Sequence, residues 1–169
     1  VIASDGDIME GVTSEASSLA GHQELENLTV IYDDNEISIE DDTDISFSED
    51  VAKRYEAYGW NTVTVDWRVS EPYTENVDAL YAALEASKQA DGKPTLIKLR
   101  TIIGWPAPNK QNTFKAHGSA LGAEEVAATK EILGLDPSKT FDVPAEVLEH
   151  ARQVARRGRQ EHDAWQERY

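Results

Sequence analysis

Strand-like and helix-like segments alternate along the chain from Val1 to Leu99. The pairs Val30-Ile31 and Leu96-Ile97 belong to continuous apolar runs, which are typical of strands covered on both faces. Alternation of this kind indicates a parallel sheet with helices packed on both sides of it. The sequence therefore predicts an α/β fold.

The element boundaries follow from the same patterns. The expected strands are Val1–Ala3, Leu28–Tyr32, Thr62–Val65 and Thr95–Leu99, and the expected helices are Asp7–Glu24, Ser46–Tyr58 and Thr74–Ala90. The stretch Thr101–Leu121 has no periodicity and is long for a structureless connection, which favours a functional role. Helical spacing resumes at Ala145 and leads into a polar tail that we expect to fray.

The first residues indicate a fragment. Val1-Ile2-Ala3 has the pattern of the end of a buried strand, and no initiator methionine or preceding sheet partner comes before it. We therefore expect the α/β fold to be incomplete in this chain.

Charge and composition exclude several classes of protein. The chain has 32 acidic residues against 16 lysines and arginines, a net charge of −16, which argues against nucleic acid as a partner. The run from Arg156 to Arg159 is better explained as a solvated helix face than as an RNA patch. There is no cysteine, so disulfides and thiolate zinc sites are excluded. No long apolar run or leader is present, and we expect a cytoplasmic protein that does not interact with membranes.

Two polar elements follow two of the predicted strands. Asp5-Gly6 comes after the first strand and Asn35 comes after the second. Ligands gather at the carboxyl edge of a parallel sheet, and carboxylate and amide oxygens suit Mg²⁺. Gly6 would let the main chain approach a phosphate closely. Asp7 is expected to cap the next helix, with Glu10 completing the capping box, so that free N–H groups face an anion.

Two simpler interpretations compete with a magnesium site. An isolated Asp-Gly and an isolated Asn are most often an ordinary cap and an ordinary turn residue. A calcium-binding EF-hand beginning at Asp33 needs Gly at its sixth position and Glu at its twelfth. Ser38 and Asp44 occupy those positions, so the EF-hand interpretation fails.

With these elements in place, the chain closely resembles the thiamine diphosphate-binding domain of the transketolase family. The segments that carry the resemblance are Asp5-Gly6 with Asn35, Glu10–His22, Ile31–Ile39, Val51–Trp60, Lys93–Ile97, Thr101–Gly104, Pro108–Lys110 and Ala116–Leu121. The resemblance implies that residues 1–144 are part of this domain and that residues 145–169 form a helix leading into the interdomain linker. It narrows the fold to the thiamine diphosphate-binding type.

The resemblance also implies an activity. Transketolases reversibly transfer a two-carbon ketol unit from a ketose phosphate to an aldose phosphate in the pentose phosphate pathway. The implied cofactors are thiamine diphosphate and Mg²⁺, with Ca²⁺ as a substitute. The implied partners are sugar-phosphate substrates and a second subunit of a homodimer.

The family's site residues carry over to this sequence by position. The implied metal ligands are Asp5, Asn35 and the main-chain oxygen of Ile37. The remaining positions are implied to contact the cofactor, and they are Ser4, Gly6, Glu10, Ile39, Ile103 and His117, together with Asn35. Ser4 replaces the family's usual glycine, which is tolerable if its φ is negative.

Three of these positions have implied roles beyond contact. His117 is the implied catalytic residue, contacting the diphosphate and the donor's terminal hydroxyl, because imidazole can donate or relay a proton near neutral pH. Ile39 and Ile103 would wall the thiazolium ring and keep water away. Glu10, with Glu15, would join a hydrogen-bonded network near the subunit interface.

Other groups that the reaction needs are implied to lie outside this chain, in a following domain and in a preceding segment. We therefore expect the chain alone to be inactive. Two alternatives stay open. The chain could belong to another thiamine diphosphate enzyme, such as a dihydroxyacetone synthase or a deoxyxylulose phosphate synthase, or it could be a non-catalytic domain of the same fold.

Overall fold

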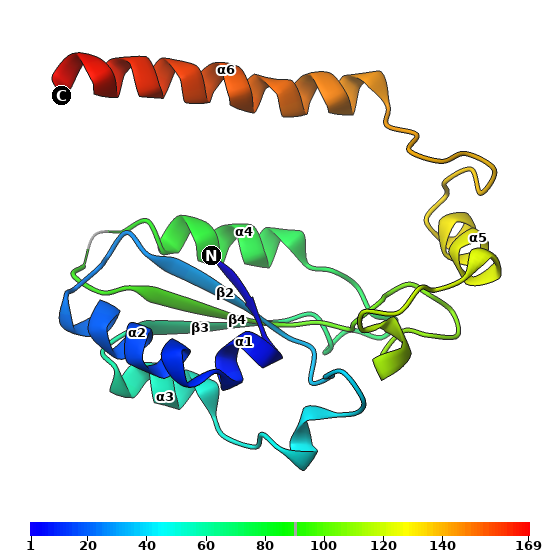
Figure 1. Cartoon of the computed structure of the whole chain (residues 1–169), viewed down its shortest axis with the longest axis horizontal. Coiled ribbons are helices and arrows are strands. Elements are labelled where there is room, and N and C mark those ends of the chain that lie inside the picture. The colour runs from blue at the N-terminus through cyan, green and yellow to red at the C-terminus, as the bar shows by residue number, and fades with distance from the viewer. Residues whose placement is uncertain (90) are drawn as a thin grey trace.

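A four-stranded parallel sheet forms the centre of the molecule. The computed structural model describes residues 1–89 and 91–169. The strands are β1 (Ile2–Ser4), β2 (Thr29–Asp34), β3 (Asn61–Asp66) and β4 (Thr95–Arg100), in the spatial order β1-β2-β4-β3 (Figure 1). All three strand pairings are parallel, which confirms the predicted sheet.

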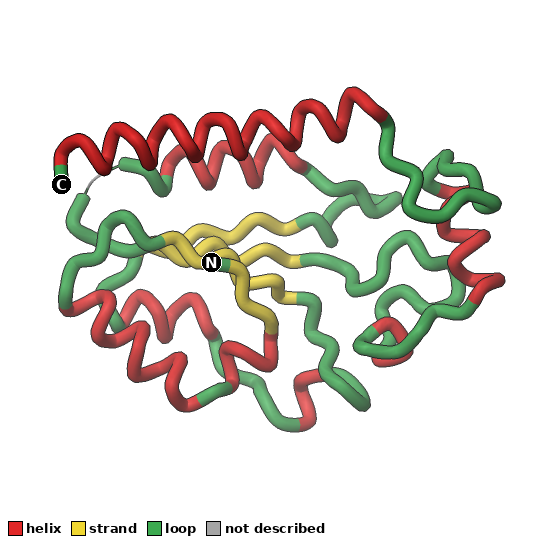
Figure 2. The backbone as a smooth tube through the Cα atoms, turned by 45° about the horizontal axis from the view of Figure 1, so that its top comes forward, coloured by secondary structure: helices red, strands yellow, loops and turns green. Residues whose placement is uncertain are grey.

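Helices cover both faces of this sheet, as predicted. The helices that do so are α1 (Asp5–Met9), α2 (Gly11–His22), α3 (Val51–Ala57) and α4 (Val77–Ala86). The chain also forms α5 (Ala123–Ile132), α6 (Ala145–Arg168) and the 3₁₀ turns η1 (Thr43–Ile45) and η2 (Phe114–Ala116). Helices α1, α2 and α3 lie on one side of the strands and α4 lies on the other (Figures 1 and 2). The connections that leave the carboxyl ends of β2 and β4 are the long irregular segments.

Each face of the sheet has its own apolar cluster. On the α1–α3 side the largest buried side chains include Tyr32, Tyr55 and Leu96. On the α4 side, Ile97 and Leu99 of β4 pack with Val65. Leu96 enters the first cluster and Ile97 the second, so this part of the central strand is apolar on both faces, whereas Lys98 and Arg100 make its carboxyl end polar.

The predicted single helix Asp7–Glu24 is wrong, because the chain breaks at Glu10. Glu10 is extended (φ −66°, ψ 134°) and separates α1 from α2. The hydroxyl of Thr13 donates to the Asp7 carbonyl at 2.6 Å, and Arg54 of α3 donates to the Ile8 carbonyl at 3.1 Å. These donors take up carbonyls at the end of α1, so the helix ends there.

The predicted cap at Asp7 is also displaced. Ser4 is the N-cap residue of α1, and Asp7 is the third residue of the helix. The Ser4 backbone amide and hydroxyl donate to the Asp7 carboxylate at 2.8 and 2.9 Å. Ser4 has φ −101°, so the condition for a tolerable serine is met and the residue is free of backbone strain.

Other boundaries differ by a few residues because side-chain caps begin the helices later than predicted. Asp50 accepts from the Lys53 amide at the start of α3, and Asn76 accepts from the Ala79 amide at the start of α4. The predicted end of the latter helix, residue 90, lies outside the described residues. Helix α5 was not predicted. The tail expected to fray is helical through Arg168.

Gly21 marks a close approach between two helices. A β-carbon at Gly21 would lie 1.8 Å from the Tyr58 carbonyl oxygen, at the end of α3. Close by, the Trp60 indole donates to the Ser17 carbonyl of α2 at 2.8 Å. Residue 21 therefore has to be glycine if α2 is to lie this near to the chain after α3.

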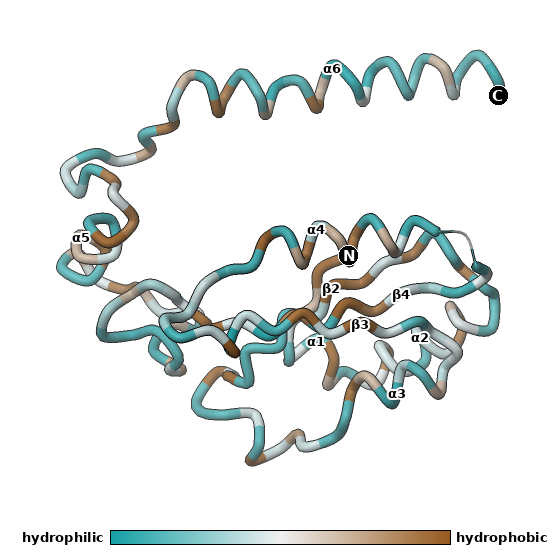
Figure 3. The backbone as a smooth tube through the Cα atoms, turned by 180° about the vertical axis from the view of Figure 1, so that it is seen from behind, coloured by the Kyte–Doolittle hydropathy of each residue, from teal (hydrophilic) through white to brown (hydrophobic). Residues whose placement is uncertain are grey.

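Within residues 1–89 and 91–169, none of the helices combines the length and the apolar character needed to cross a bilayer. Helix α6 is the longest of them, and it alternates polar and apolar positions along its length (Figure 3).

Replacing Leu96 tests the central position of β4. Leu96 is fully buried between the strands and α1–α3. We expect Leu96→Ala to lower the free energy of unfolding by about 2–5 kcal/mol, through lost burial and a residual cavity. The measurement is urea denaturation. Leu135→Ala is the matched control, because Leu135 is 55% exposed and its truncation should have little effect. Equal losses in both variants would contradict this packing.

Candidate functional site

Asp5 and Asn35 meet at the carboxyl edge of the sheet, as predicted. In the parallel pairing of β1 with β2, Ser4 lies opposite Asp33, so Asp5 and Asn35 follow directly at neighbouring strand ends. Both side chains are buried, with exposed fractions of 2% and 8%. The Asn35 backbone amide is near enough to the Asp5 carboxylate to act on its pKa. The structure therefore brings the two predicted side-chain ligands together.

The Asp5 carboxylate is only half satisfied. Its Oδ1 accepts a hydrogen bond from the Tyr32 hydroxyl at 2.6 Å. Its Oδ2 is buried and has no hydrogen-bond partner among residues 1–89 and 91–169. Burial raises the pKa of Asp5, and the Tyr32 hydrogen bond opposes that rise only in part. A buried acceptor oxygen without a donor fits a ligand position for a hard cation.

Tyr32 is a part of the site that the sequence prediction missed. Its hydroxyl reaches Asp5 from β2, and Asp34 Oδ1 lies 3.4 Å away from it. Burial raises the pKa of Tyr32, and the hydrogen bond to Asp5 raises it further. Tyr32 therefore keeps its proton and orients the carboxylate as a donor. It was missed because it lies within a strand pattern that indicates only a core residue.

The turn after β2 presents the remaining predicted ligands. The amide oxygen of Asn35 accepts from the Ile37 backbone amide at 3.1 Å. The Glu36 carbonyl accepts from the Thr43 amide at 3.0 Å. Ile37 is buried, and in the described part of the chain its carbonyl oxygen accepts no hydrogen bond. This free carbonyl is compatible with its predicted role as the main-chain ligand.

Glu36, between these two residues, is held by two arginines. Its φ is +63°, a left-handed conformation that is uncommon outside glycine. Its carboxylate pairs with Arg68, which follows β3, and with Arg100 at the end of β4, the latter at 2.8 Å. Arg100 also lies 3.4 Å from both Asp34 and Asp66. These charged side chains were not singled out in the sequence because the strands that bring them together are distant along the chain.

A cavity of about 490 Å³ adjoins this turn. Its lining includes Asn35, Glu36, Arg68, Lys98 and Asn112, so acidic, basic and amide groups all face it. Lys98 forms an ion pair with the buried Asp34 at 3.1 Å. The cavity is therefore polar and lies beside the predicted ligand turn.

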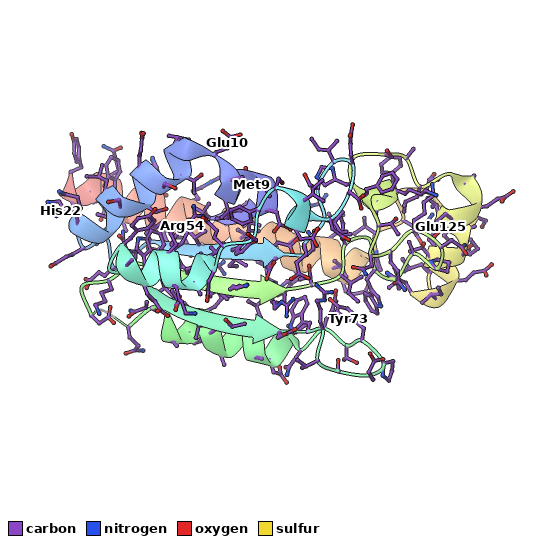
Figure 4. All side chains as sticks on the ribbon, turned by 90° about the horizontal axis from the view of Figure 1, so that it is seen from below. Met9, Glu10, His22, Arg54, Tyr73 and Glu125 are labelled. Atoms are coloured by element: carbon purple, nitrogen blue, oxygen red, sulfur yellow. The ribbon has the colours of Figure 1, made fainter. Side chains whose placement is uncertain are left out.

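Among the other predicted contact residues, the Gly6 main chain is accessible, whereas the polar groups of Ser4 are already used in hydrogen bonds. A β-carbon at Gly6 would meet no atom within 4 Å, so the main chain there can be approached. The Ser4 amide already donates to Asp7, which removes that N–H from a phosphate as long as α1 keeps its cap. Glu10 lies on the outer surface at the break between α1 and α2 (Figure 4).

The loop residues are less closely tied to the sheet edge. Ile39 is 71% exposed, Ile103 is half-buried, and His117 is exposed at the end of η2. In the described residues, no hydrogen bond joins His117 to Asp5 or Asn35. The predicted roles of these three residues therefore stay predictions.

Helix α5 anchors the loop that carries His117. Both oxygens of Glu125 are used by Asn109, whose backbone amide and side-chain amide donate at 2.7 and 2.9 Å. The hydrogen bonds from Asn109 lower the pKa of Glu125. Trp105 of the same loop packs on Tyr73 of the β3–α4 connection, with ring centroids 5.3 Å apart. Glu125 and Tyr73 are labelled in Figure 4. Glu125 was missed because its helix was not predicted.

Among residues 1–89 and 91–169 there is no group of three or more His, Cys, Asp or Glu side chains suited to hold a metal. The site at the carboxyl edge has a different donor set, consisting of one carboxylate, one amide and one backbone carbonyl. All three are oxygen donors, and such a partial set suits Mg²⁺, which usually takes its other ligands from phosphate and water.

The fold and the site together define an α/β cofactor-binding domain with an oxygen-ligand site at the carboxyl edge of its sheet. Comparison with known proteins gives the particular family. Residues 1–169 match the family described as transketolase, thiamine diphosphate binding domain, and the chain belongs to this family.

Several relatives extend the comparison. The chain is 55% identical to a transketolase of Mycobacterium tuberculosis and 56% identical to one of Mycobacterium leprae, over 98% of this chain and 23% of each relative. It superimposes on a Pichia stipitis transketolase in complex with sedoheptulose-7-phosphate, with a TM-score of 0.87 and 40% identity, over 99% of this chain and 24% of that one. The chain thus spans about a quarter of the length of these relatives.

The ion pairs of Glu36 with Arg68 and Arg100 should make the free energy of unfolding depend on pH in the acidic range. Burial acts to raise the pKa of Glu36, but Arg68 and Arg100 outweigh it, so the pKa is lowered from 4.5. A carboxyl with a lowered folded-state pKa contributes stability above about 4.5 and loses it as pH falls through the lower folded value. We expect Glu36→Gln to lose less stability than wild type between pH 5 and pH 3 in urea titrations. Parallel losses would show that the arginines do not favour the charged form.

Proposed function

We propose that this chain supplies the diphosphate- and metal-binding side of a transketolase. The proposed reaction is reversible transfer of a two-carbon ketol unit from a ketose phosphate to an aldose phosphate, in the pentose phosphate pathway. The observation that carries the proposal is the buried Asp5 carboxylate with one oxygen unpartnered, beside Asn35 and the free Ile37 carbonyl. Membership of the family and the sugar phosphate bound to the Pichia stipitis relative support it.

The proposed cofactors are thiamine diphosphate and Mg²⁺, for which Ca²⁺ can substitute. When bound, thiamine diphosphate supplies the carbon nucleophile that accepts the two-carbon unit. Asp5, Asn35 and the Ile37 carbonyl would hold the metal on the diphosphate, and Tyr32 would keep the Asp5 carboxylate in place. The open surface at Gly6 would let a phosphate oxygen approach the main chain.

His117 is proposed to orient the donor sugar, acting as a hydrogen-bond donor near the diphosphate. Its loop is fixed by Glu125 through Asn109, so the imidazole is carried on an anchored segment. Ile39 and Ile103 are proposed to exclude water from the reacting carbon, and Ser4 and Glu10 to contribute at the cofactor's periphery. Because Ile39 is exposed, it would exclude water only when the cofactor or a neighbouring chain covers it.

The proposed setting is a longer, homodimeric, cytoplasmic protein that uses sugar phosphates and neither nucleic acid nor membrane. Residues 1–144 would belong to its thiamine diphosphate-binding domain and residues 145–169 to a helix leading into the linker. Because other parts of the site are proposed to lie elsewhere, the chain alone is expected to be inactive, and activity is assayed in the full-length protein.

Replacing Asp5 tests the metal site directly. In the full-length protein we expect Asp5→Asn to weaken Mg²⁺-dependent thiamine diphosphate binding by more than the roughly 10- to 100-fold that loss of an outer-shell partner costs. Without metal, its thermal stability should be at least that of wild type, because a neutral amide suits the buried position. Calorimetry and thermal unfolding measure the two effects.

The control for this experiment is Asp78→Asn, which removes an exposed acidic group in the first turn of α4, outside the lining of the cavity beside the ligand turn. It should bind the cofactor like wild type. Cofactor binding by Asp5→Asn equal to that of wild type would refute the proposed metal site, and with it the argument for a cofactor at this edge.

Replacing His117 tests the proposed donor contact. We expect His117→Ala to lower kcat/KM for a ketose phosphate about 100-fold or more, as is typical of a lost proton donor. Steady-state kinetics with saturating cofactor give the value. His22→Ala is the control, since His22 ends α2 and has no proposed role. A kcat/KM within about twofold of wild type would remove His117 from the catalytic residues.

A further inference from the structure

The ion pairs around Glu36 do more than join neighbouring strands. Glu36 lies between Asn35 and Ile37, the two proposed ligands of the turn after β2. Arg68 and Arg100 reach it from the carboxyl ends of β3 and β4. The three side chains thus tie the ligand turn to both of the other strands on that side of the sheet.

The backbone at Glu36 makes this attachment significant. A residue with a β-carbon at φ +63° is in a conformation that costs free energy unless the surroundings hold it there. Nothing in the side chain of glutamate offsets this cost locally, as the short side chain of Asn or Asp can. The two guanidinium groups supply the holding interactions from outside the turn.

The turn's own hydrogen bonds depend on this conformation. The Asn35 side-chain oxygen accepts from the Ile37 backbone amide. The Glu36 carbonyl accepts from the Thr43 backbone amide, and the Ser38 backbone amide donates to the Asp41 carbonyl at 2.9 Å. A change of φ at residue 36 would rotate the Ile37 peptide relative to Asn35. Both proposed ligand oxygens would then move relative to Asp5, which is fixed separately by Tyr32.

We propose that Glu36, clamped by Arg68 and Arg100, is a positioning residue that holds the Asn35–Ile37 turn in its metal-binding conformation. The clamp acts on the ligands through the backbone of the turn. This role in cofactor binding depends on the function proposed above, whereas the ordering of the turn does not.

Two substitutions at residue 36 separate the effect of the ion pairs from the effect of the backbone conformation. In the full-length protein, Glu36→Ala loses the ion pairs and keeps the cost of the left-handed conformation, while Glu36→Gly loses the ion pairs and removes that cost. We expect Mg²⁺-dependent thiamine diphosphate binding to weaken about tenfold in the alanine variant and less than about threefold in the glycine variant, because only the alanine variant keeps the cost of the left-handed conformation. Calorimetry gives both affinities.

A double-mutant cycle tests the arginine. Arg68→Met should weaken cofactor binding when residue 36 is Glu and leave it unchanged in the Glu36→Gly background, because the pair acts as a unit. Equal effects in both backgrounds would overturn the proposal, as would wild-type affinity in Glu36→Ala. Glu85→Ala is the matched control, because it removes an exposed ion pair between Glu85 of α4 and Lys88, just after that helix, and should leave cofactor affinity unchanged.

Amide hydrogen exchange tests the clamp in the absence of cofactor. In the metal-free protein, the Ile37, Ser38 and Thr43 amides should exchange about tenfold faster in Glu36→Ala than in wild type, and close to the wild-type rate in Glu36→Gly. Unchanged protection in the alanine variant would overturn the clamp. If wild type fails to bind the cofactor while this exchange pattern is seen, the proposed function is wrong and the clamp of the turn stands.

Discussion

The site depends on the parallel alignment of β2 with its neighbours on both sides. The register that sets Ser4 against Asp33 also sets Asp34 against Arg100, so that three strand ends stop at one edge. Since a slip of one residue would exchange the two faces of a strand, it would send Tyr32 away from Asp5 as well as expose the core. The same backbone hydrogen bonds therefore fix the fold and the approach of the proposed ligands.

The two buried carboxylates at this edge, Asp5 and Asp34, differ in the partners that the protein gives them. The oxygen of Asp5 that faces Tyr32 is satisfied, whereas its second oxygen is buried without a partner. Asp34, equally buried, has two cationic neighbours, Lys98 and Arg100. The protein supplies cations to the Asp34 carboxylate, whereas the Asp5 carboxylate keeps an unpartnered oxygen, which the proposed function assigns to a metal ion. Two acidic residues close together in space thus serve different purposes, with Asp34 stabilising the edge and Asp5 carrying the proposed chemistry.

Much of the fold was predictable, because continuous apolar runs and their alternation with helical patterns are local signals. Asp5 and Asn35 were predictable as neighbours for the same reason, since parallel strands end together. The break at Glu10 was not, because it depends on Arg54, which is distant in sequence. Tyr32, Arg68 and Arg100 were missed on similar grounds, as their roles arise only when the strands are assembled. The exposed positions of Ile39 and His117 likewise could not be derived from residue type.

The close approach at Gly21 extends the influence of the site well beyond its own residues. Helix α2 can lie against the chain after α3 only because residue 21 has no side chain, and Arg54 of α3 in turn holds the end of α1 beside Asp5. An inherited change at Gly21 would push these helices apart and disturb the start of α1 from a distance. In the proposed function, such a change would lower cofactor affinity through the packing of these helices.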